Sequence, residues 1–270
     1  FAFCCAKRTL FSSSASSRFT RLSFCFIFMF ALEVKNLVKY YGNFKALNEV
    51  SFEIKEGEIF GLIGPNAAGK STTLKIIATL LTFNSGTVSV FGNDLSKEQH
   101  KIRSMISYLA EEAGAYKNLS GEDYLKFIAS FYSKNKKERD LLVEKAKEIA
   151  DLDDKIKEKA STYSKGMTRK LLLSRALMPE AKLTILDEPT SGLDVLNAIK
   201  IRDIIKKFRE KGITFLVSSH NMLEVEYLCD RLALINKGKI VEIGKPDELE
   251  AKYQVQNMEE VFEKATSAYV

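Results

Sequence analysis

A glycine-rich loop in the first third of the chain has the residue types and spacing that bind phosphate. Its eight residues fit the pattern G-x-x-x-x-G-K-[ST], and Thr72 follows them. In order, the loop contains Gly64, Pro65, Asn66, Ala67, Ala68, Gly69, Lys70 and Ser71. Backbone N–H groups at a helix N-terminus can hold phosphate oxygens, Lys70 would reach the β- and γ-phosphates, and the Ser71 hydroxyl would bind Mg²⁺. This phosphate loop therefore predicts a site for nucleotide phosphates and a metal ion.

An acidic pair, Asp187 and Glu188, could supply the other half of this chemistry. The pair follows a strand-like apolar run over residues 183–186. A carboxylate at the end of a buried strand costs free energy unless it faces a cation, so we assign Asp187 to Mg²⁺. Glu188 is then placed to polarise a water molecule for attack on the γ-phosphate. A capping acid in a strand-end turn is the alternative, and the phosphate loop makes it the weaker one.

The flanking segments must bring the loop and the pair to one edge of a sheet. An apolar run over 58–63 predicts a buried strand that feeds the loop, and a helix is expected over 70–81. Strand and helix signals alternate again after the acidic pair, which implies a mostly parallel sheet with helices on both faces. Further helices are expected over 197–211 and 222–229, and further strands over 31–37, 50–54, 87–91, 104–109, 213–218, 232–235 and 239–243.

The middle of the chain, about 112–178, is charged and helical and interrupts this alternation. Ser120 and Asp123 resemble a capping box before a helix over 122–132. Two more helices are expected over 136–152 and 165–177. The apolar face of the first of these would contain Leu141, Leu142, Ala146 and Ile149. We expect this segment to be a helical subdomain inserted into the nucleotide-binding core.

The first thirty residues differ in composition from the rest. They contain Lys7, Arg8, Arg18 and Arg21 and no acidic residue, a composition typical of transit peptides. We nevertheless expect an upstream translated extension, with natural synthesis starting at Met29; a targeting segment or a surface anchor is the alternative. In either case, residues 1–30 should be poorly ordered and lie outside the folded domain.

Charge and hydropathy limit the possible partners. The chain has 41 Lys and Arg against 35 Asp and Glu, and without the first thirty residues the count is 37 against 35. Such a balanced body lacks the basic stripe of a nucleic-acid-binding protein, so no nucleic acid is expected. No apolar run approaches the roughly 20 residues of a transmembrane helix, so a membrane part would have to come from another chain.

In their order and spacing, these segments resemble the nucleotide-binding domain of ABC transporters from about Leu32 to the C-terminus. His220 falls at the family's switch histidine, and Tyr41 falls at the aromatic that stacks on adenine, with Tyr40 as the alternative. Residues 191–194 look like the D-loop, and residues 164–167 stand where the family has its signature, usually L-S-G-G-Q. The D-loop candidates are Ser191, Gly192, Leu193 and Asp194, and the signature candidates are Ser164, Lys165, Gly166 and Met167.

The resemblance implies an α/β fold for residues 31–270: a P-loop NTPase core with a mostly parallel sheet, a small N-terminal antiparallel β subdomain and the inserted α-helical subdomain. It implies ATP and Mg²⁺ as cofactors, with Glu188 and His220 as catalytic residues. Ser71, Asp187 and Glu111 would lie near the metal. Two subunits would enclose two ATP molecules, the signature of each acting on the ATP of the other.

Two positions depart from the family pattern. Ala67 stands where the family usually has Gly, and a loop glycine there can use a backbone geometry that Ala adopts less easily. Glu111 stands where the family usually has Gln, but it can still offer an oxygen and a charge that suits a cation. We expect nucleotide binding to survive the first departure and Glu111 to remain near the metal.

The resemblance also implies a transmembrane permease on a separate chain, with this chain peripheral at the cytoplasmic face of the membrane. Residues 257–262 resemble the closing segment of exporter ATPases with a separate permease. The leading hypothesis is an ATP-hydrolysing motor for export. The alternatives are a soluble ABC-type ATPase that acts on ribosomes or DNA, and a module that binds ATP without turnover. One near-neutral domain disfavours the former, and the complete set of Lys70, Asp187, Glu188 and His220 disfavours the latter.

Overall fold

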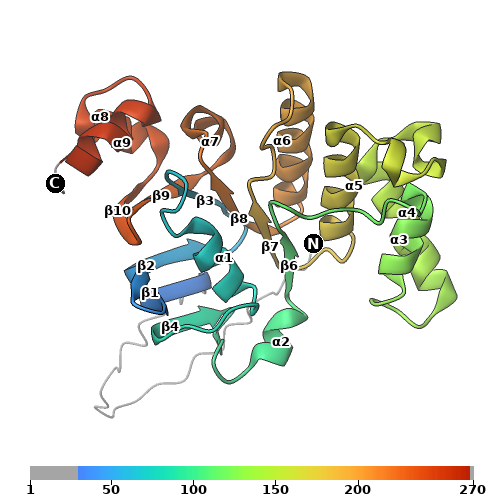
Figure 1. Ribbon diagram of the computed structural model, residues 1–270, viewed down its shortest axis with the longest axis horizontal. Coiled ribbons are helices and arrows are strands. Elements are labelled where there is room, and N and C mark those ends of the chain that lie inside the picture. Colours follow the sequence, from blue (N-terminus) through green and yellow to red (C-terminus); the bar gives the residue numbers. More distant parts are fainter. Residues whose placement is uncertain (1–29, 268–270) are drawn as a thin grey trace, which may run out of the picture.

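Two β-sheets organise the chain, and the larger one carries the predicted site (Figure 1). The structure is a computed structural model and describes residues 30–267. The expected N-terminal extension therefore lies outside the described residues, except for Phe30, which begins the first strand.

The larger sheet has six strands in the order β10-β9-β3-β8-β7-β6. Neighbouring strands are parallel throughout, except that β10 runs antiparallel to β9. Every residue of β3, β7 and β8 is buried, as expected for parallel strands covered on both faces. The bounds are Ile59–Ile63 for β3, Ile106–Leu109 for β6, Leu183–Asp187 for β7, Thr214–Ser219 for β8, Arg231–Asn236 for β9 and Lys239–Gly244 for β10.

The smaller sheet is antiparallel and has the order β2-β1-β4-β5. Its strands are β1 Phe30–Tyr41, β2 Phe44–Lys55, β4 Ser85–Val90 and β5 Asn93–Asp94. Helix α1, Lys70–Ile77, contacts β2 of this sheet and β7 and β8 of the larger one. A buried cluster that includes Leu32, Phe60, Leu74 and Ile185 therefore joins both sheets through α1. The expected antiparallel subdomain and parallel core are confirmed.

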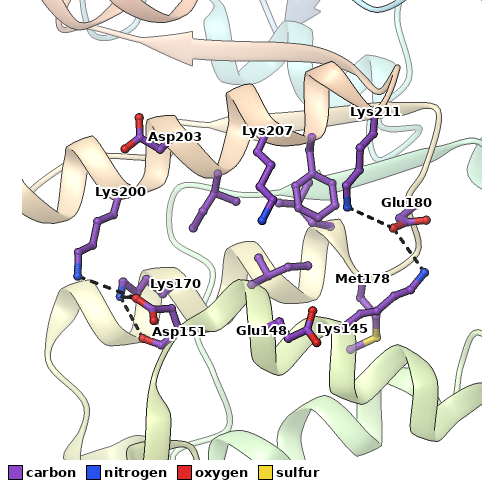
Figure 2. Close-up of a pocket in the computed structure, with 14 residues that line it drawn as sticks. Lys145, Glu148, Asp151, Lys170, Met178, Glu180, Lys200, Asp203, Lys207 and Lys211 are labelled. Atoms are coloured by element: carbon purple, nitrogen blue, oxygen red, sulfur yellow. Dashed lines mark hydrogen bonds and ion pairs between the residues drawn. The ribbon is translucent and has the colours of Figure 1, made fainter.

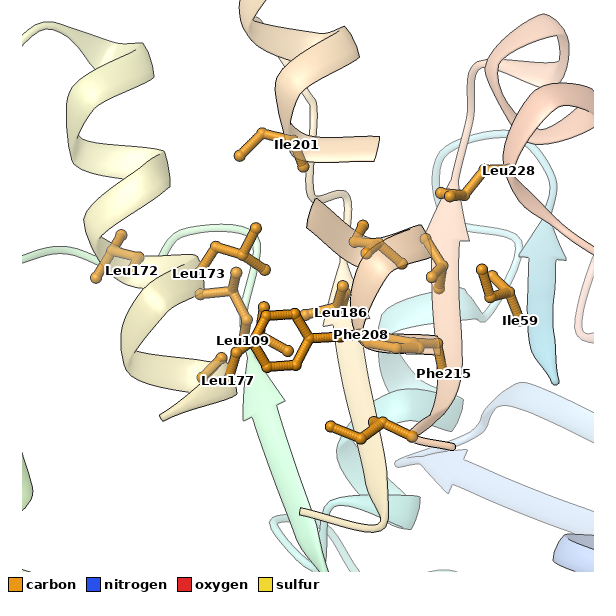
Figure 3. Packing of buried hydrophobic residues seen from close by; sticks show 14 of the residues in the cluster. Ile59, Leu109, Leu172, Leu173, Leu177, Leu186, Ile201, Phe208, Phe215 and Leu228 are labelled. Atoms are coloured by element: carbon orange, nitrogen blue, oxygen red, sulfur yellow. The ribbon is translucent and has the colours of Figure 1, made fainter. Parts of the chain in front are cut away.

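Apart from α1 and the helices of the middle segment, the helices lie in two parts of the chain. Helix α2 (Gln99–Arg103) follows the smaller sheet, while α6 (Val195–Glu210), α7 (Met222–Leu228), α8 (Pro246–Tyr253) and α9 (Met258–Ser267) follow the acidic pair. Phe208 of α6 and Leu186 of β7 belong to a second buried cluster, which extends to Leu172, Leu173 and Leu177 of the helical middle segment (Figure 3). This cluster packs the middle segment against residues of the larger sheet.

The middle segment contains α3 (Gly121–Ala129), α4 (Lys136–Ala150) and α5 (Lys165–Leu177), with two short 3₁₀ turns between α4 and α5 (Figure 1). Ser120, Asn135 and Ser164 cap the three N-termini with side-chain oxygens that accept backbone N–H bonds. The expected apolar face of α4 was partly wrong. Leu141 is 58% exposed, and Val143, Ala146 and Ala150 are the residues that α4 buries. The helix is oriented so that its smaller side chains pack against α5.

Several element boundaries also differ from the sequence expectation. Helix α1 ends at Ile77, not residue 81, because Thr79 adopts a left-handed backbone (φ 62) that stops the helix. Helices α2 and α8 and the two-residue strand β5 were not expected. Each is short, and α2 and α8 begin in segments with weak apolar periodicity.

Candidate nucleotide site

The predicted site residues converge on one edge of the larger sheet. Strands β3, β6, β7 and β8 are parallel, so the residues that follow them, Gly64, Ala110, Glu188 and His220, lie at the same carboxyl edge. A cleft of about 330 Å³ opens there. It is lined by Tyr41, Phe44, Ala46, Pro65, Asn66, Ala67, Ala68, Gly69, Lys70, Ser71, Thr72, Glu111 and Glu188.

The phosphate loop is shaped by two residues with left-handed backbones. Gly69 precedes α1 with φ 109, where a side chain would meet Leu47 at 2.7 Å, so only glycine fits. Ala67 has φ 62, a left-handed geometry that alanine adopts less easily than glycine. An L-residue in this region costs about 1–2 kcal/mol. The loop therefore stores some strain at the position where the family usually has glycine.

Lys70 folds back over the mouth of the loop. Its Nζ donates to the carbonyl oxygens of Gly64 (2.7 Å) and Pro65 (3.2 Å) and lies 3.5 Å from Glu188 Oε1. The side chains of Lys70 and Glu188 are both buried. A buried cation that faces the loop is placed to meet an incoming phosphate anion.

Asp187 is the centre of an oxygen-rich cluster. Ser218 Oγ donates to Asp187 Oδ1 at 2.6 Å, Ser71 Oγ donates to the same oxygen at 3.3 Å, and Tyr108 OH reaches Oδ2 at 3.5 Å. Burial raises the pKa of Tyr108, and the Asp187 carboxylate adds to the shift, so the phenol stays protonated and donates. The hydroxyl and carboxylate oxygens of Ser71 and Asp187 are hard donors that fit Mg²⁺.

The described residues contain no group of three or more His, Cys, Asp or Glu side chains that could hold a metal by themselves. Mg²⁺ usually takes one or two carboxylates and completes its shell with water and substrate phosphates. Ser71 and Asp187 fit that arrangement. Glu111, the third expected ligand, lines the same cleft as Ser71.

Glu188 connects the loop to His220. Its Oε2 lies 2.8 Å from His220 Nδ1, while Oε1 faces Lys70. The Glu188 backbone is left-handed (φ 50), and its N–H is held by the carbonyl and hydroxyl oxygens of Ser218 at 3.2 and 3.0 Å. A strained backbone at such a carboxylate persists only where its surroundings fix it.

Two aromatic rings form the outer wall of the cleft. Tyr41 lines it, as expected for an adenine stacker, and Tyr40 does not. Phe44, which the sequence analysis did not select, lines it too and is 66% exposed. Tyr41 and Phe44 are paired across the turn between β1 and β2. The signal in the sequence was an apolar aromatic directly after a two-residue turn, where the strand face is hard to assign.

The signature and D-loop residues lie outside this cleft. None of Ser164, Lys165, Gly166 or Met167 lines it, nor does any of Ser191, Gly192, Leu193 or Asp194. Ser164 caps α5 by accepting the Met167 N–H at 3.2 Å, and Asp194 caps α6 by accepting the Asn197 N–H at 3.2 Å. A side chain at Gly166 would meet the Asn197 amide at 2.8 Å, and one at Gly192 would collide with the Lys165 amine. The two segments therefore pack together on the neighbouring surface.

Three further residues at the site escaped the sequence analysis. They are Ser218 and Tyr108, which bond Asp187, and Arg169, which donates to backbone carbonyls beside it. Ser218 lies near the end of β8, two residues before His220, so its place at the shared strand edge could have been inferred. Tyr108 and Arg169 carried no such signal, because their roles depend on the packing of β6 and α5.

A second cavity, of about 430 Å³, lies between α4, α5 and α6 (Figure 2). Its charged rim is largely paired: Lys170 Nζ lies 2.9 Å from Asp151 Oδ2, and Lys145 Nζ lies 3.5 Å from Glu180 Oε1. Leu177, Met178 and Phe208 are among its apolar lining residues. This cavity therefore lies at the junction of the middle segment and the core, and it shares no lining residue with the nucleotide cleft.

Fold and cleft together define a nucleotide triphosphatase of the P-loop class. The chain belongs to the ABC transporter family, whose family model matches residues 47–191. It is an ATP-binding and ATP-hydrolysing subunit of this family and the motor of a transporter.

Individual relatives and solved structures agree. The chain is 36% identical to the linearmycin resistance ATP-binding protein LnrL of Bacillus subtilis (strain 168), with 81% of this chain and 70% of that protein covered. It is 37% identical to the lantibiotic transport ATP-binding protein SrtF of Streptococcus pyogenes, with 86% and 95% covered.

Among solved structures, an ATP-binding subunit of an ABC transporter superposes with a TM-score of 0.78 at 28% identity, over 87% of this chain and 99% of that one. The dimeric post-hydrolysis state of the ATP-binding cassette MJ0796, bound to ADP and Pi, has a TM-score of 0.72 at 25% identity, over 79% and 98%.

Proposed function

We propose that this chain drives export through a transmembrane permease on a separate chain, with Glu188 as the residue that activates water. The observation that carries the proposal is the position of the Glu188 carboxylate, which bridges Lys70 and His220 at the mouth of the phosphate loop. Residues 31–270 form one nucleotide-binding domain in this proposal, with residues 112–178 as its helical insertion.

In this proposal, different residues of the cleft bind the phosphates, the adenine and the metal ion. Backbone N–H groups of the phosphate loop and the Lys70 amine bind the β- and γ-phosphates, and Tyr41 packs on the adenine. When bound, Mg²⁺ would neutralise phosphate charge, held by Ser71 and Asp187 with Glu111 beside it. Arrival of a γ-phosphate draws Lys70 away from Glu188, which leaves one carboxylate oxygen free to accept a proton from water. His220 is half exposed beside that carboxylate, and in this proposal it donates to the γ-phosphate.

A second copy of the chain completes the site in this proposal. The signature residues 164–167 stand at the N-terminus of α5, where a hydroxyl, free N–H groups and the helix dipole favour an anion. Because they lie outside their own chain's cleft, the phosphate that they contact belongs to the partner's nucleotide. The dimeric cassette MJ0796 supports this arrangement by likeness.

An exposed aromatic surface supports the docking of a permease on the helical insertion. The surface consists of Tyr116, Phe127, Phe131 and Tyr132, each more than two-fifths exposed. Tyr116, Phe127 and Phe131 form consecutive edge-to-face contacts at 5.7 and 5.0 Å between ring centroids. Apolar patches of this kind mark interaction sites on soluble domains. Within residues 30–267, no helix combines the length and apolar character needed to cross a bilayer.

The relatives favour export over the other hypotheses. LnrL is named for linearmycin resistance and SrtF for lantibiotic transport. By likeness, we assign this chain to the export of a drug-like or antibiotic-like substrate, at the cytoplasmic face of the membrane. The permease, not this chain, selects that substrate.

Co-purification from detergent-solubilised membranes of the native cells tests the proposal. A tagged chain should retain an integral membrane protein and hydrolyse ATP in the presence of Mg²⁺. Recovery of ribosomal particles or DNA in place of a membrane protein would favour the soluble ABC-type ATPase. A complex that binds ATP without releasing phosphate would favour the non-hydrolytic module.

A further inference from the structure

The guanidinium of Arg169 joins the two loops that carry Glu188 and Glu111. Arg169 lies in the second turn of α5, five residues after Ser164, and is only 7% exposed. Its Nε donates to Pro189 O at 2.8 Å, and its Nη2 donates to Asp187 O at 2.8 Å and to Glu188 O at 2.6 Å. Its Nη1 donates to Ala110 O and Glu111 O, both at 3.2 Å.

These contacts involve all three nitrogens of one rigid, planar group. A buried cation is costly unless it is hydrogen-bonded, and the carbonyl oxygens of the two loops satisfy it. Burial lowers the pKa of Arg169, while the nearby carboxylates of Asp187, Glu111 and Glu188 oppose that shift. A guanidinium remains charged under such conditions. The arrangement is therefore specific for arginine, because a lysine amine has three donors and no planar fork.

The contacts fix the backbone of Glu188 on both sides. Its N–H is bonded to Ser218, and its carbonyl oxygen accepts from Arg169. Between these two anchors, the residue keeps its left-handed backbone, with φ 50, and aims its carboxylate at Lys70 and His220. Without the Arg169 contact, the Glu188 carbonyl would still accept the Ser191 N–H at 3.2 Å but would lose its shorter bond, at 2.6 Å, so the strained backbone would be held less firmly.

Arg169 also links these loops to α5, the helix that begins at the signature residues. The carbonyl of Glu111 and the carbonyl of Glu188 are held by one side chain of α5. One rigid, planar guanidinium therefore ties the Glu111 carbonyl to the Glu188 carbonyl and anchors both loops to α5. A nearby cavity of about 380 Å³ is lined by Glu111, Lys165, Arg169, Glu188 and Leu193, among others, so these groups from both loops and from α5 face one space.

We propose that Arg169 is a positioning residue, which holds Glu188 in the orientation that hydrolysis requires and links it to Glu111 and to the signature helix. The inference rests on the proposed role of Glu188. It assigns to Arg169 no contact with ATP, so nucleotide binding should be independent of it.

The test compares Arg169→Lys with Arg175→Lys. Arg175 lies on the same helix and donates one N–H, to Tyr108 O at 3.3 Å, which a lysine can replace. Arg169→Lys should lower kcat for ATP hydrolysis by about 10- to 100-fold, as misplacement of a catalytic group does, with the KM for ATP within about threefold. Arg175→Lys should leave kcat and KM within about twofold.

A double-mutant cycle separates positioning from general structural damage. If Arg169 acts through the Glu188 carboxylate, Arg169→Lys in a Glu188→Gln background should change the single-turnover rate by less than about threefold.

The proposal would be overturned if the two substitutions lowered the single-turnover rate multiplicatively, or if kcat for Arg169→Lys stayed within twofold of wild type. Loss of the fold in both Arg169→Lys and Arg169→Gln would also overturn it, since Arg169 would then be a structural residue. A wild-type chain that releases no phosphate would contradict the proposed function itself.

Discussion

His220 Nδ1 lies 2.8 Å from Glu188 Oε2, so the two residues proposed as catalytic are in direct contact. They come from the ends of two adjacent parallel strands, β8 and β7. Glu188 is buried and His220 is half exposed. The histidine can therefore turn toward a nucleotide at little cost, while the carboxylate stays fixed.

Replacement of His220 should impair hydrolysis more than binding. We expect His220→Ala to lower kcat by about 10²-fold, within the range of a lost proton-transfer or donor group, because both its contact with Glu188 and its donation to phosphate disappear. Steady-state phosphate release with saturating ATP measures the effect. His100→Ala is the matched control, since His100 is the other histidine of the chain and is exposed on α2. Equal activities of the two variants would remove His220 from the mechanism.

Ala67 provides a test of strain in the phosphate loop. Ala67→Gly relieves a left-handed alanine worth about 1–2 kcal/mol, while the added freedom of the unfolded chain costs about 0.4–1 kcal/mol. We therefore expect a gain of about 0–1.6 kcal/mol in the free energy of unfolding, and ATP binding in both proteins. Urea unfolding and nucleotide titration measure the two quantities.

Ala68→Gly is the control for this pair. Ala68 is buried without a positive φ, so its replacement should destabilise the protein by about 0.5–1 kcal/mol. A wild-type chain that fails to bind ATP, together with rescue by Ala67→Gly, would show that Ala67 disables the loop.

The aromatic wall predicts which rings contribute to nucleotide affinity. Removal of an aromatic contact worth about 1 kcal/mol should raise the Kd for ATP about fivefold, so we expect this from Tyr41→Ala and from Phe44→Ala. Tyr40→Ala should change the Kd by less than twofold, because Tyr40 does not line the cleft. Titration with a fluorescent ATP analogue compares the three variants. A larger effect from Tyr40 than from Tyr41 would exchange their roles.

Glu111 should influence the metal requirement. Its side chain lines the cleft with Ser71, so we expect Glu111→Ala to raise the Mg²⁺ concentration for half-maximal hydrolysis by about fivefold and Glu111→Gln to raise it less, because an amide still offers an oxygen. Glu112→Ala is the control, since Glu112 lies outside this cleft. An unchanged Mg²⁺ dependence in Glu111→Ala would place this side chain away from the metal.

The sequence predicted best where local patterns and the required chemistry agree. The loop from Gly64 to Ser71, the helix after it and the acidic pair at the end of β7 follow from spacing and buried apolar runs, and α5 matches the expected range of 165–177. The face of α4 was assigned partly wrongly, because Leu141 is more hydrophobic than the small residues that actually pack. Periodicity alone cannot rank an exposed leucine below a buried alanine.

The remaining site residues depend on contacts between distant segments. Arg169 lies 18 positions before Asp187 and 59 after Ala110, yet it bonds both of their carbonyls. A sequence pattern cannot show that an arginine near the start of a helix turns inward to bind strand ends. Phe44 was also missed, but for a more local reason, because its exposure depends on the turn that joins β1 to β2.

Glu188→Gln is the most direct test of the central claim, that this chain hydrolyses ATP at a site completed by a second copy. Phosphate release and ATP-dependent dimerisation are measured on the same protein, by a coupled assay and by size-exclusion chromatography with light scattering. The account predicts a fall in turnover of about 10²- to 10⁴-fold, the range for a lost general base, with ATP binding intact and a dimer that persists in ATP. Unchanged turnover, or a chain that stays monomeric with ATP bound, would contradict it.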